Sequence, residues 1–340
     1  MGTTAIEWTQ QTWNPVAGCT WADPACDHCY AATMTRRLAA MGQKDYAGLA
    51  TAKHFNGKVR TLEHRLGIPL RRKKATRWFV NSMSDLFHKS VAFEFVDRVF
   101  AVMALCPHHT FQILTKRPER MAEYTRGVRG RLDDDGETEE EEAIISALAD
   151  SSDYERVIAD GCAWLNKFNS RNMGWPLPNV WLGCSVGNQA AADRSREHFR
   201  DVRAAVKFVS YEPAIGPVDW TGWEFVNQII GGGESGPKAR PSNPQWHFDT
   251  RDFCTSRGIA YFFKQWGSWA LASYENGFEG HVMPNKPKQF CWVDFHGNTA
   301  CPSAKDLTAD PVYAMGRTSK KAAGRLLDGR EWNEMPEVAR

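Results

Sequence analysis

Short apolar runs that end in a polar residue or a glycine recur along the first 270 residues of the chain. Patterns with the 3.6-residue period of an amphipathic helix separate several of them, at residues 91–105, 190–202 and 248–257. This alternation predicts parallel βα units. The chain is therefore expected to have an α/β fold, a partial or full (β/α) TIM-type barrel, with its functional residues at the carboxyl ends of the strands. The runs are residues 12–17, 77–85, 110–116, 179–185, 205–212, 225–231 and 259–265.

Two regions depart from this alternation. Residues 119–178 are too long for one crossover and contain an acidic run, so we expect a helical, acidic insertion within a barrel that spans residues 1–270. In residues 271–340 Gly, Asn and Pro recur without strand-helix alternation, which predicts a C-terminal extension packed on the barrel. A short helix at residues 320–327 and a turn at 328–330 are expected within it.

The composition narrows the class of protein. The 340 residues are 42% hydrophobic and include 14 Trp, enough to bury a substantial core. A signal-peptide pattern and an apolar stretch long enough to cross a membrane are both missing from the sequence, so we expect a cytoplasmic protein without a membrane partner. Six of the nine cysteines are scattered without a paired pattern, which favours reduced thiols over a disulfide framework.

The other three cysteines lie close together near the start of the chain. Cys19, Cys26 and Cys29 have the spacing C-x6-C-x2-C, and Tyr30 follows them. Three thiolates can hold a 4Fe-4S cluster whose fourth iron stays open to a ligand. Zinc is the alternative, with His28 as a fourth ligand in a Cys3His site. Unliganded thiols are the remaining interpretation.

This loop resembles the signature of the radical S-adenosylmethionine (SAM) enzymes, C-x3-C-x2-C-aromatic, with a longer first spacing. The Trp13-Asn14-Pro15 sequence before the loop and the Cys-Asp-His-Cys-Tyr sequence within it are similar to the phage-associated three-Cys-motif family. The resemblance implies a 4Fe-4S cluster on Cys19, Cys26 and Cys29, with SAM bound at the open iron.

The resemblance extends to two strand ends. Residues 81–87 and 113–118 look like the second and third strand ends of the spore photoproduct lyase branch of radical SAM enzymes, which acts on a thymine lesion in DNA. It implies that Ser84 and Asp85 face the SAM amino group and that Lys116 reaches its carboxylate. The complete set of residues expected to bind the cofactor is Tyr30, Ser84, Asp85, Lys116, Ser185, Glu212 and Glu234.

Each of these assignments has a structural alternative. Asp85, Lys116 and Glu212 could form ion pairs that cap the barrel, because charges at strand ends often pair with each other. Glu234 lies in a Gly-Gly-Gly-Glu-Ser sequence that could bind a ribose hydroxyl or the substrate, or could be a plain turn. Cys184 is a candidate hydrogen-atom donor beside Ser185, with a small buried core residue as the alternative.

The net charge is only +2, but the charges are segregated. Nine Lys or Arg face one acid between residues 53 and 77, directly before the second strand. If this stretch lies along the barrel mouth, it would follow a phosphate backbone, with Arg71, Arg72, Lys73 and Lys74 as the phosphate-binding residues. A solvated surface, or a partner for the acidic run, is the alternative.

The predicted function is that of a radical SAM enzyme, in which a reduced cluster cleaves SAM and the resulting radical abstracts hydrogen from a substrate. A nucleobase in DNA or RNA, modified or repaired, is the expected substrate, extruded toward the radical. A flavodoxin- or ferredoxin-type protein would supply the electron. The alternatives are a radical SAM enzyme that acts on a peptide or small metabolite, and a zinc-containing nucleic-acid-binding protein without catalysis. The sequence leaves the oligomeric state open.

Overall fold

The computed structural model describes residues 4, 6–126, 176–271, 290–300, 307 and 309–337. Most of the expected insertion at residues 119–178, including its acidic run and Cys162, lies outside the described residues, as does Cys301. No helix in the described ranges is both long enough and apolar enough to cross a membrane.

A seven-stranded parallel sheet forms the centre of the molecule, with the strands in the order of the chain. The strand ladders are in register along its whole width, apart from one irregularity at Gly231 and Gly232. Each of the seven apolar runs supplies one strand, so the α/β class is confirmed. The strands are β1 (Gln11–Trp13), β4 (Arg77–Val80), β5 (Thr110–Thr115), β6 (Val180–Ser185), β7 (Val206–Tyr211), β8 (Gln228–Gly232) and β9 (Ala260–Gln265).

The first strand differs from the prediction. Residues 12–17 do not form one strand, because the chain leaves the sheet after β1 and pairs again as β2 (Val16–Ala17) with β3 (Arg60–Thr61), antiparallel. Pro15 lies at the break, and proline cannot donate a backbone hydrogen bond to a ladder. The run at residues 77–85 is also shorter as a strand, because Asn81 turns the chain with a positive φ of 60°.

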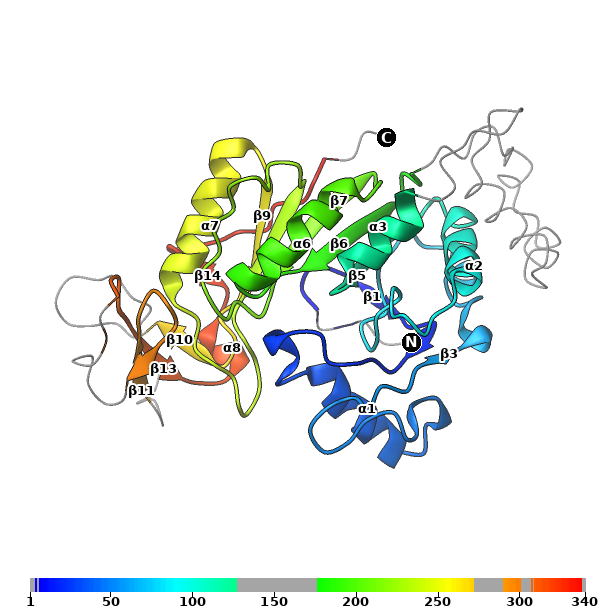
Figure 1. Cartoon of the computed structure of the whole chain (residues 1–340), viewed down its shortest axis with the longest axis horizontal. Helices are drawn as coiled ribbons and strands as arrows, with labels where there is room; N and C mark the ends of the chain where they lie inside the picture. Colours follow the sequence, from blue (N-terminus) through cyan, green and yellow to red (C-terminus); the bar gives the residue numbers. More distant parts are fainter. Residues whose placement is uncertain are drawn as a thin grey trace.

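Helices connect the strands and cover one face of the sheet, as Figure 1 shows for α3, α6 and α7. Right-handed crossovers between strands that are neighbours in sequence put the helices that connect them on the same side of the sheet. Asn188 and Asn243 cap α6 and α7 with their side chains, and Gly258 ends α7 in the left-handed conformation. The α-helices are α1 (Tyr30–Ala40), α2 (Phe93–Ala104), α3 (Pro118–Arg126), α6 (Gln189–Asp201), α7 (Pro244–Arg257) and α8 (Lys320–Ala323). Short 3-10 turns are Pro24–Cys26, Lys44–Tyr46, Glu63–Arg65 and Pro69–Arg71.

The two faces of the sheet bury different sets of side chains. The main core lies under the helices and contains the residues that point outward from the strands, such as Phe111, Leu182 and Tyr261. The inner face carries Phe79, Trp181, Phe208, Ile230 and Phe262, and the N-terminal Trp8 packs against them.

The sheet is open, because β1 and β9 are its edges and do not pair with each other. A full TIM barrel is therefore not formed by the described strands. Both edges are covered. Near β1, Trp13 donates its indole N–H to the carbonyl of Arg65. At β9, a segment close to the C-terminus runs antiparallel to the strand, and Phe263 donates to the carbonyl of Trp332.

The described part of the C-terminal extension contains a second, antiparallel sheet with the strand order β10-β13-β11-β12. The predicted helix at residues 320–327 ends after one turn, because α8 stops at Ala323 before Gly324. Leu326 and Leu327 belong to a hairpin whose tight turn at Asp328 and Gly329 was expected. The remaining strands are β10 (Trp269–Leu271), β11 (Phe290–Val293), β12 (Thr299–Ala300), β13 (Tyr313–Arg317), β14 (Leu326–Leu327) and β15 (Arg330–Glu331).

Candidate functional site

The cysteine loop follows β1 and β2 and lies at the carboxyl edge of the parallel sheet. Gly18 continues alongside β4 through a parallel bridge to Ser84. The side-chain carbonyl of Asn14 accepts hydrogen bonds from the hydroxyl of Ser82 and the amide of Met83, both at 3.1 Å. The two stretches that carry the sequence resemblance, around Trp13 and after Val80, are therefore in direct contact.

The three cysteines are neighbours in this loop. Cys26 ends a 3-10 turn capped by Asp23, and Cys29 is the N-cap of α1. All three are half-buried, and Cys26 contributes to the raised pKa of both Cys19 and Cys29. Within the described residues, no three His, Cys, Asp or Glu side chains are close enough together to hold one metal ion.

Some groups around the thiols raise their pKa and others lower it. Burial raises the pKa of Cys19 to about 12, Asp85 adds to the rise, and Arg117 opposes it. Burial also raises the pKa of Cys29, against the backbone amides of Ala32 and Ala31 at the start of α1. Thiols must lose their protons to bind a metal, so cations and helix amides beside them favour the metal-bound form.

Asp85 is buried and fully engaged by protein groups. It accepts hydrogen bonds from the Thr115 hydroxyl at 2.7 Å, the Phe87 amide at 3.0 Å and the Lys116 amide at 3.2 Å. It also forms an ion pair with Arg117 at 2.6 Å. The geometry favours the structural alternative for Asp85 over contact with a SAM amino group. Ser84 is engaged as well, because its hydroxyl donates to the carbonyl of Val16.

Alternation along the strands turns a second set of polar side chains toward the inner face. The Lys116 ammonium lies 2.5 Å from the hydroxyl of Ser185, on the next strand. Glu212, at the end of β7, pairs with Lys264 at 2.8 Å and accepts a hydrogen bond from Gln265. Lys116 and Glu212 thus face the same side of the sheet at its carboxyl edge, and Lys264 lies beside the Glu212 carboxylate.

Tyr30 lies between the cysteine loop and these strand ends. Its hydroxyl donates to the carbonyl of Ser82 at 2.6 Å. Desolvation, and after it the Cys29 thiol and the Glu212 carboxylate, raises the pKa of this hydroxyl, although the residue is 57% exposed. The ring is thus both fixed by a hydrogen bond and accessible.

Glu234 holds the cysteine loop from the other side. One carboxylate oxygen lies 3.1 Å from His28 Nδ1, and both oxygens accept hydrogen bonds from Arg240. Arg240 also donates to the carbonyl of Pro24. Although burial opposes it, these bonds from Arg240 and His28 lower the pKa of Glu234. With both oxygens occupied, Glu234 is a loop anchor in this geometry rather than a free ligand for ribose or substrate.

The glycines before Glu234 serve packing between strands. A Cβ atom on Gly233 would lie 2.1 Å from the carbonyl oxygen of Trp266. The absence of a side chain at Gly233 therefore lets two segments of the chain approach each other closely.

Cys184 does not face the other site residues. Its side chain is fully buried in the main core with Leu182 and Val186, while the adjacent Ser185 points to the inner face. Burial raises the pKa of the thiol far above its usual range. The structure favours the core alternative for Cys184 over the hydrogen-atom donor.

The basic stretch is split between the two edges of the sheet. Arg71, Arg72, Lys73 and Lys74 precede the first residue of β4 and thus lie at the amino edge, and His108, before β5, binds the carbonyl of Arg72. The cysteines lie at the carboxyl edge, beyond the length of β4, which is about 13 Å for four residues. These four residues do not line the barrel mouth with the cysteines, which corrects the arrangement that a nucleic-acid path was expected to follow.

A family model described as "Protein of unknown function (DUF5131)" matches residues 3–336. The chain belongs to this DUF5131 family. The match includes the cysteine loop, all seven strands of the sheet and most of the C-terminal extension. Comparison with curated proteins and with solved structures finds no significant match.

Several residues of the candidate site were missed by the sequence analysis. Arg117 donates to Cys19. Asp23 accepts from the Cys26 thiol at 4.0 Å, and its other carboxylate oxygen lies 3.8 Å from the Lys116 ammonium. Lys264 and Arg240 pair with Glu212 and Glu234. Lys264 could have been recognised in the sequence as a cation at the end of an apolar run. Arg240, the partner of Glu234, comes from a loop that has neither hydrophobic periodicity nor a motif.

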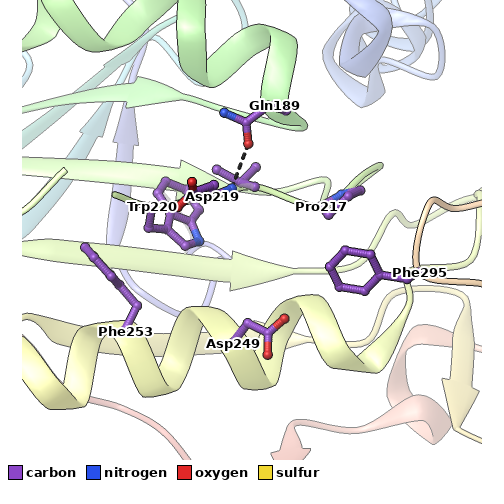
Figure 2. Close-up of a pocket in the computed structure, with 8 residues that line it drawn as sticks. Gln189, Pro217, Asp219, Trp220, Asp249, Phe253 and Phe295 are labelled. Carbon is purple, nitrogen blue, oxygen red and sulfur yellow. Dashed lines mark hydrogen bonds between the residues drawn. The ribbon is translucent and has the colours of Figure 1, made fainter. Parts of the chain in front are cut away.

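A separate pocket of about 450 Å³ opens on the helix-covered side of the sheet (Figure 2). Its walls are mainly apolar, and Asp219 donates its backbone N–H to Gln189 at 2.7 Å. It shares no residue with the cysteine loop or the inner-face polar set. The lining residues are Gln189, Pro217, Val218, Asp219, Trp220, Asp249, Phe253 and Phe295.

Proposed function

We propose that the protein is a radical SAM enzyme with a 4Fe-4S cluster on Cys19, Cys26 and Cys29. The observation that carries the proposal is the position of these cysteines: three neighbouring, half-buried thiols at the carboxyl edge of a parallel sheet in sequential strand order. Function in β/α folds of this kind gathers at that edge.

The three thiols are donors that suit either a 4Fe-4S cluster or a zinc ion. Zinc–sulfur bonds of about 2.3 Å require thiolates within roughly 4 Å of one another. A four-iron cluster is wider and takes its thiolate ligands at larger separations. Cys26 acts electrostatically on both other thiols, so the three lie near enough to one another for a shared cluster to be proposed on them.

SAM would bind beside the cluster, against the inner face of the sheet. We assign its carboxylate to Lys116 and Ser185 and its amino group to Glu212, because these side chains face that side together. Tyr30 is fixed and accessible next to them, as a ring that packs against the cofactor must be. When bound, the cluster and SAM supply reductive carbon–sulfur cleavage and hydrogen abstraction, with the electron drawn from a flavodoxin- or ferredoxin-type donor.

The substrate we propose is a nucleobase in DNA or RNA. Its support is the surface around the cysteine loop, where Trp21, Tyr30 and Met34 are exposed and Arg37 lies on the same face of α1 as the last two. Exposed aromatic rings beside cations are suited to stacking bases while binding phosphate. A peptide or a small metabolite remains the alternative substrate class.

Anaerobic reconstitution with iron and sulfide tests the cluster. We expect brown protein with about four irons and absorbance near 400 nm, as is usual for such clusters. SAM cleavage to methionine and 5'-deoxyadenosine under a strong reductant should follow. A colourless protein that holds one zinc ion tightly would overturn the proposal.

One observation favours the zinc alternative. His28 donates or accepts through Nδ1 to a buried carboxylate, which leaves Nε2 available, and metal-binding histidines commonly have such a carboxylate partner. The variant His28→Ala distinguishes a zinc site from an iron-sulfur cluster. It should abolish metal binding in a Cys3His zinc site and leave the iron content of a three-cysteine cluster unchanged.

A further inference from the structure

Arg117 directs a guanidinium group at the first cysteine. Its Nη1 lies 3.8 Å from the sulfur of Cys19, and its Nη2 donates to the carbonyl of Thr20 at 3.2 Å and to the Thr20 hydroxyl at 2.7 Å. The side chain is only 13% exposed. Burying a charge is costly unless the charge is paired and hydrogen-bonded, so the partners of this guanidinium are part of the site.

The guanidinium is held in this orientation by Asp85. Nη1 forms the ion pair with Asp85 at 2.6 Å, and Asp85 is itself fixed by Thr115 and by the amides of Phe87 and Lys116. The ring of His88 lies 3.0 Å from the Thr20 hydroxyl and holds the same loop residue from another side. The planar fork of arginine can meet the acid, Thr20 and the sulfur together, whereas lysine offers a single point charge.

We propose that Arg117 is a positioning residue that orients Cys19 and raises the reduction potential of the cluster. This inference rests on the proposed function. The reduced cluster is more negative than the oxidised one, so an N–H group and a positive charge at a ligand sulfur stabilise the reduced form. Asp85 moderates the effect because its negative charge pairs with the same Nη1 atom that lies beside the Cys19 sulfur.

Redox titration of the reconstituted cluster tests the inference, with each midpoint compared with that of wild-type protein. Arg117→Gln removes the cation and should shift the midpoint to a more negative potential, and Arg117→Lys should shift it in the same direction but less far. Asp85→Asn removes the opposing charge and should shift it to a more positive potential. A merely structural role for the pair would not give shifts of opposite sign.

Arg126→Gln is the matched control. Arg126 is on the same helix, α3, but its partner is Asp201 and half of its side chain is exposed. The control should have the wild-type midpoint. If Arg117→Gln and Asp85→Asn keep four irons and also have the wild-type midpoint, the inference is overturned and the proposed function stands. If wild-type protein takes up no cluster, both are overturned.

Discussion

At the scale of single residues, hydrogen-bond partners decide what each acid near the cysteines can do. Asp85, Glu212 and Glu234 all follow strands at the same edge of the sheet. Protein donors occupy the oxygens of all three acids. Asp85 and Glu234 are almost completely buried, whereas Glu212 is half-buried and pairs with a lysine that faces the inner side. A ligand that reaches the sheet edge can therefore compete for Glu212 more easily than for the other two.

Replacement of single cysteines should separate ligands from core thiols. Cys26→Ala is expected to abolish cluster assembly and SAM cleavage, because a cubane held by two thiolates loses a protein ligand. Cys254→Ala, in a fully buried core position, should lower stability while keeping the iron content. Iron and sulfide counting on both variants is the measurement. Normal iron content in Cys26→Ala would contradict the assignment.

His247 should make stability depend on pH. It is fully buried, with Nε2 2.9 Å from the Ser242 hydroxyl, and burial lowers its pKa to about 3. Between pH 6.5 and 3 the unfolded state binds the extra proton, so stability falls as pH decreases below 6.5. At pH 5 this one group should cost about 2 kcal/mol relative to pH 7.

His247→Gln removes the titrating group and isolates this contribution. The free energy of unfolding, measured by urea titration at pH 7 and pH 5, should change by about 2 kcal/mol less in the variant than in wild type. His109, whose pKa burial lowers to about 4, is present in both proteins and cancels in the comparison. Equal pH dependence in both proteins would show that burial does not keep the His247 side chain neutral in the folded state.

At the scale of elements, α1 joins the cysteine loop to an exposed surface. The helix starts at Tyr30, directly after Cys29, so its free amides point into the loop. Tyr30, Met34, Arg37 and Met41 follow one another along one exposed face of it. The large apolar side chains on this face, with Trp21, are four of the five that are most exposed among the described residues.

Changes on this face should weaken binding to single-stranded DNA or RNA. Trp21→Ala is expected to cost about 1 to 3 kcal/mol per stacked base, and Arg37→Glu should lower the slope of log K against log salt by about one or two. Fluorescence anisotropy over a salt series measures both. Charge reversal at Arg71, Arg72, Lys73 and Lys74 is the control for general electrostatics, because these residues lie at the opposite edge of the sheet.

The two sets of variants discriminate between paths for the nucleic acid. If only the reversal of residues 71–74 flattens the salt slope, the phosphate backbone runs along the amino edge and not past the cysteines. If wild-type protein shows no salt-dependent binding at low ionic strength, the nucleobase proposal fails and a peptide or metabolite takes its place.

At the scale of the whole molecule, an open parallel sheet needs protection at both edges. The segment that protects β9 comes from the far end of the chain. Trp332 is 8% exposed and its indole N–H donates to Leu327, while Glu334 exchanges hydrogen bonds with Tyr261. The C-terminal extension thus contributes to the stability of the parallel sheet.

Trp332→Ala should therefore destabilise the fold by about 3 to 5 kcal/mol, the usual cost of removing a buried aromatic side chain. Trp21→Ala is the matched control, because Trp21 is 52% exposed and should cost well under 1 kcal/mol on the same measurement. Chemical unfolding followed by circular dichroism gives both values. Equal losses would mean that the terminal segment does not hold the β9 edge.

Local patterns determined the strands of the central sheet. Apolar runs of strand length, separated by helical periods, predicted all seven parallel strands and the α/β class, because burial on both faces leaves a signal within each run. The spacing of Cys19, Cys26 and Cys29 likewise singled out one loop.

Only the tertiary structure decided which polar side chains face which side of the sheet and which partners they meet. Arg117 reaches Cys19 across 98 residues of chain, and Glu234 reaches His28 across 206. Such contacts depend on the strand register and on the face of the sheet, and neither is encoded in the spacing of one motif.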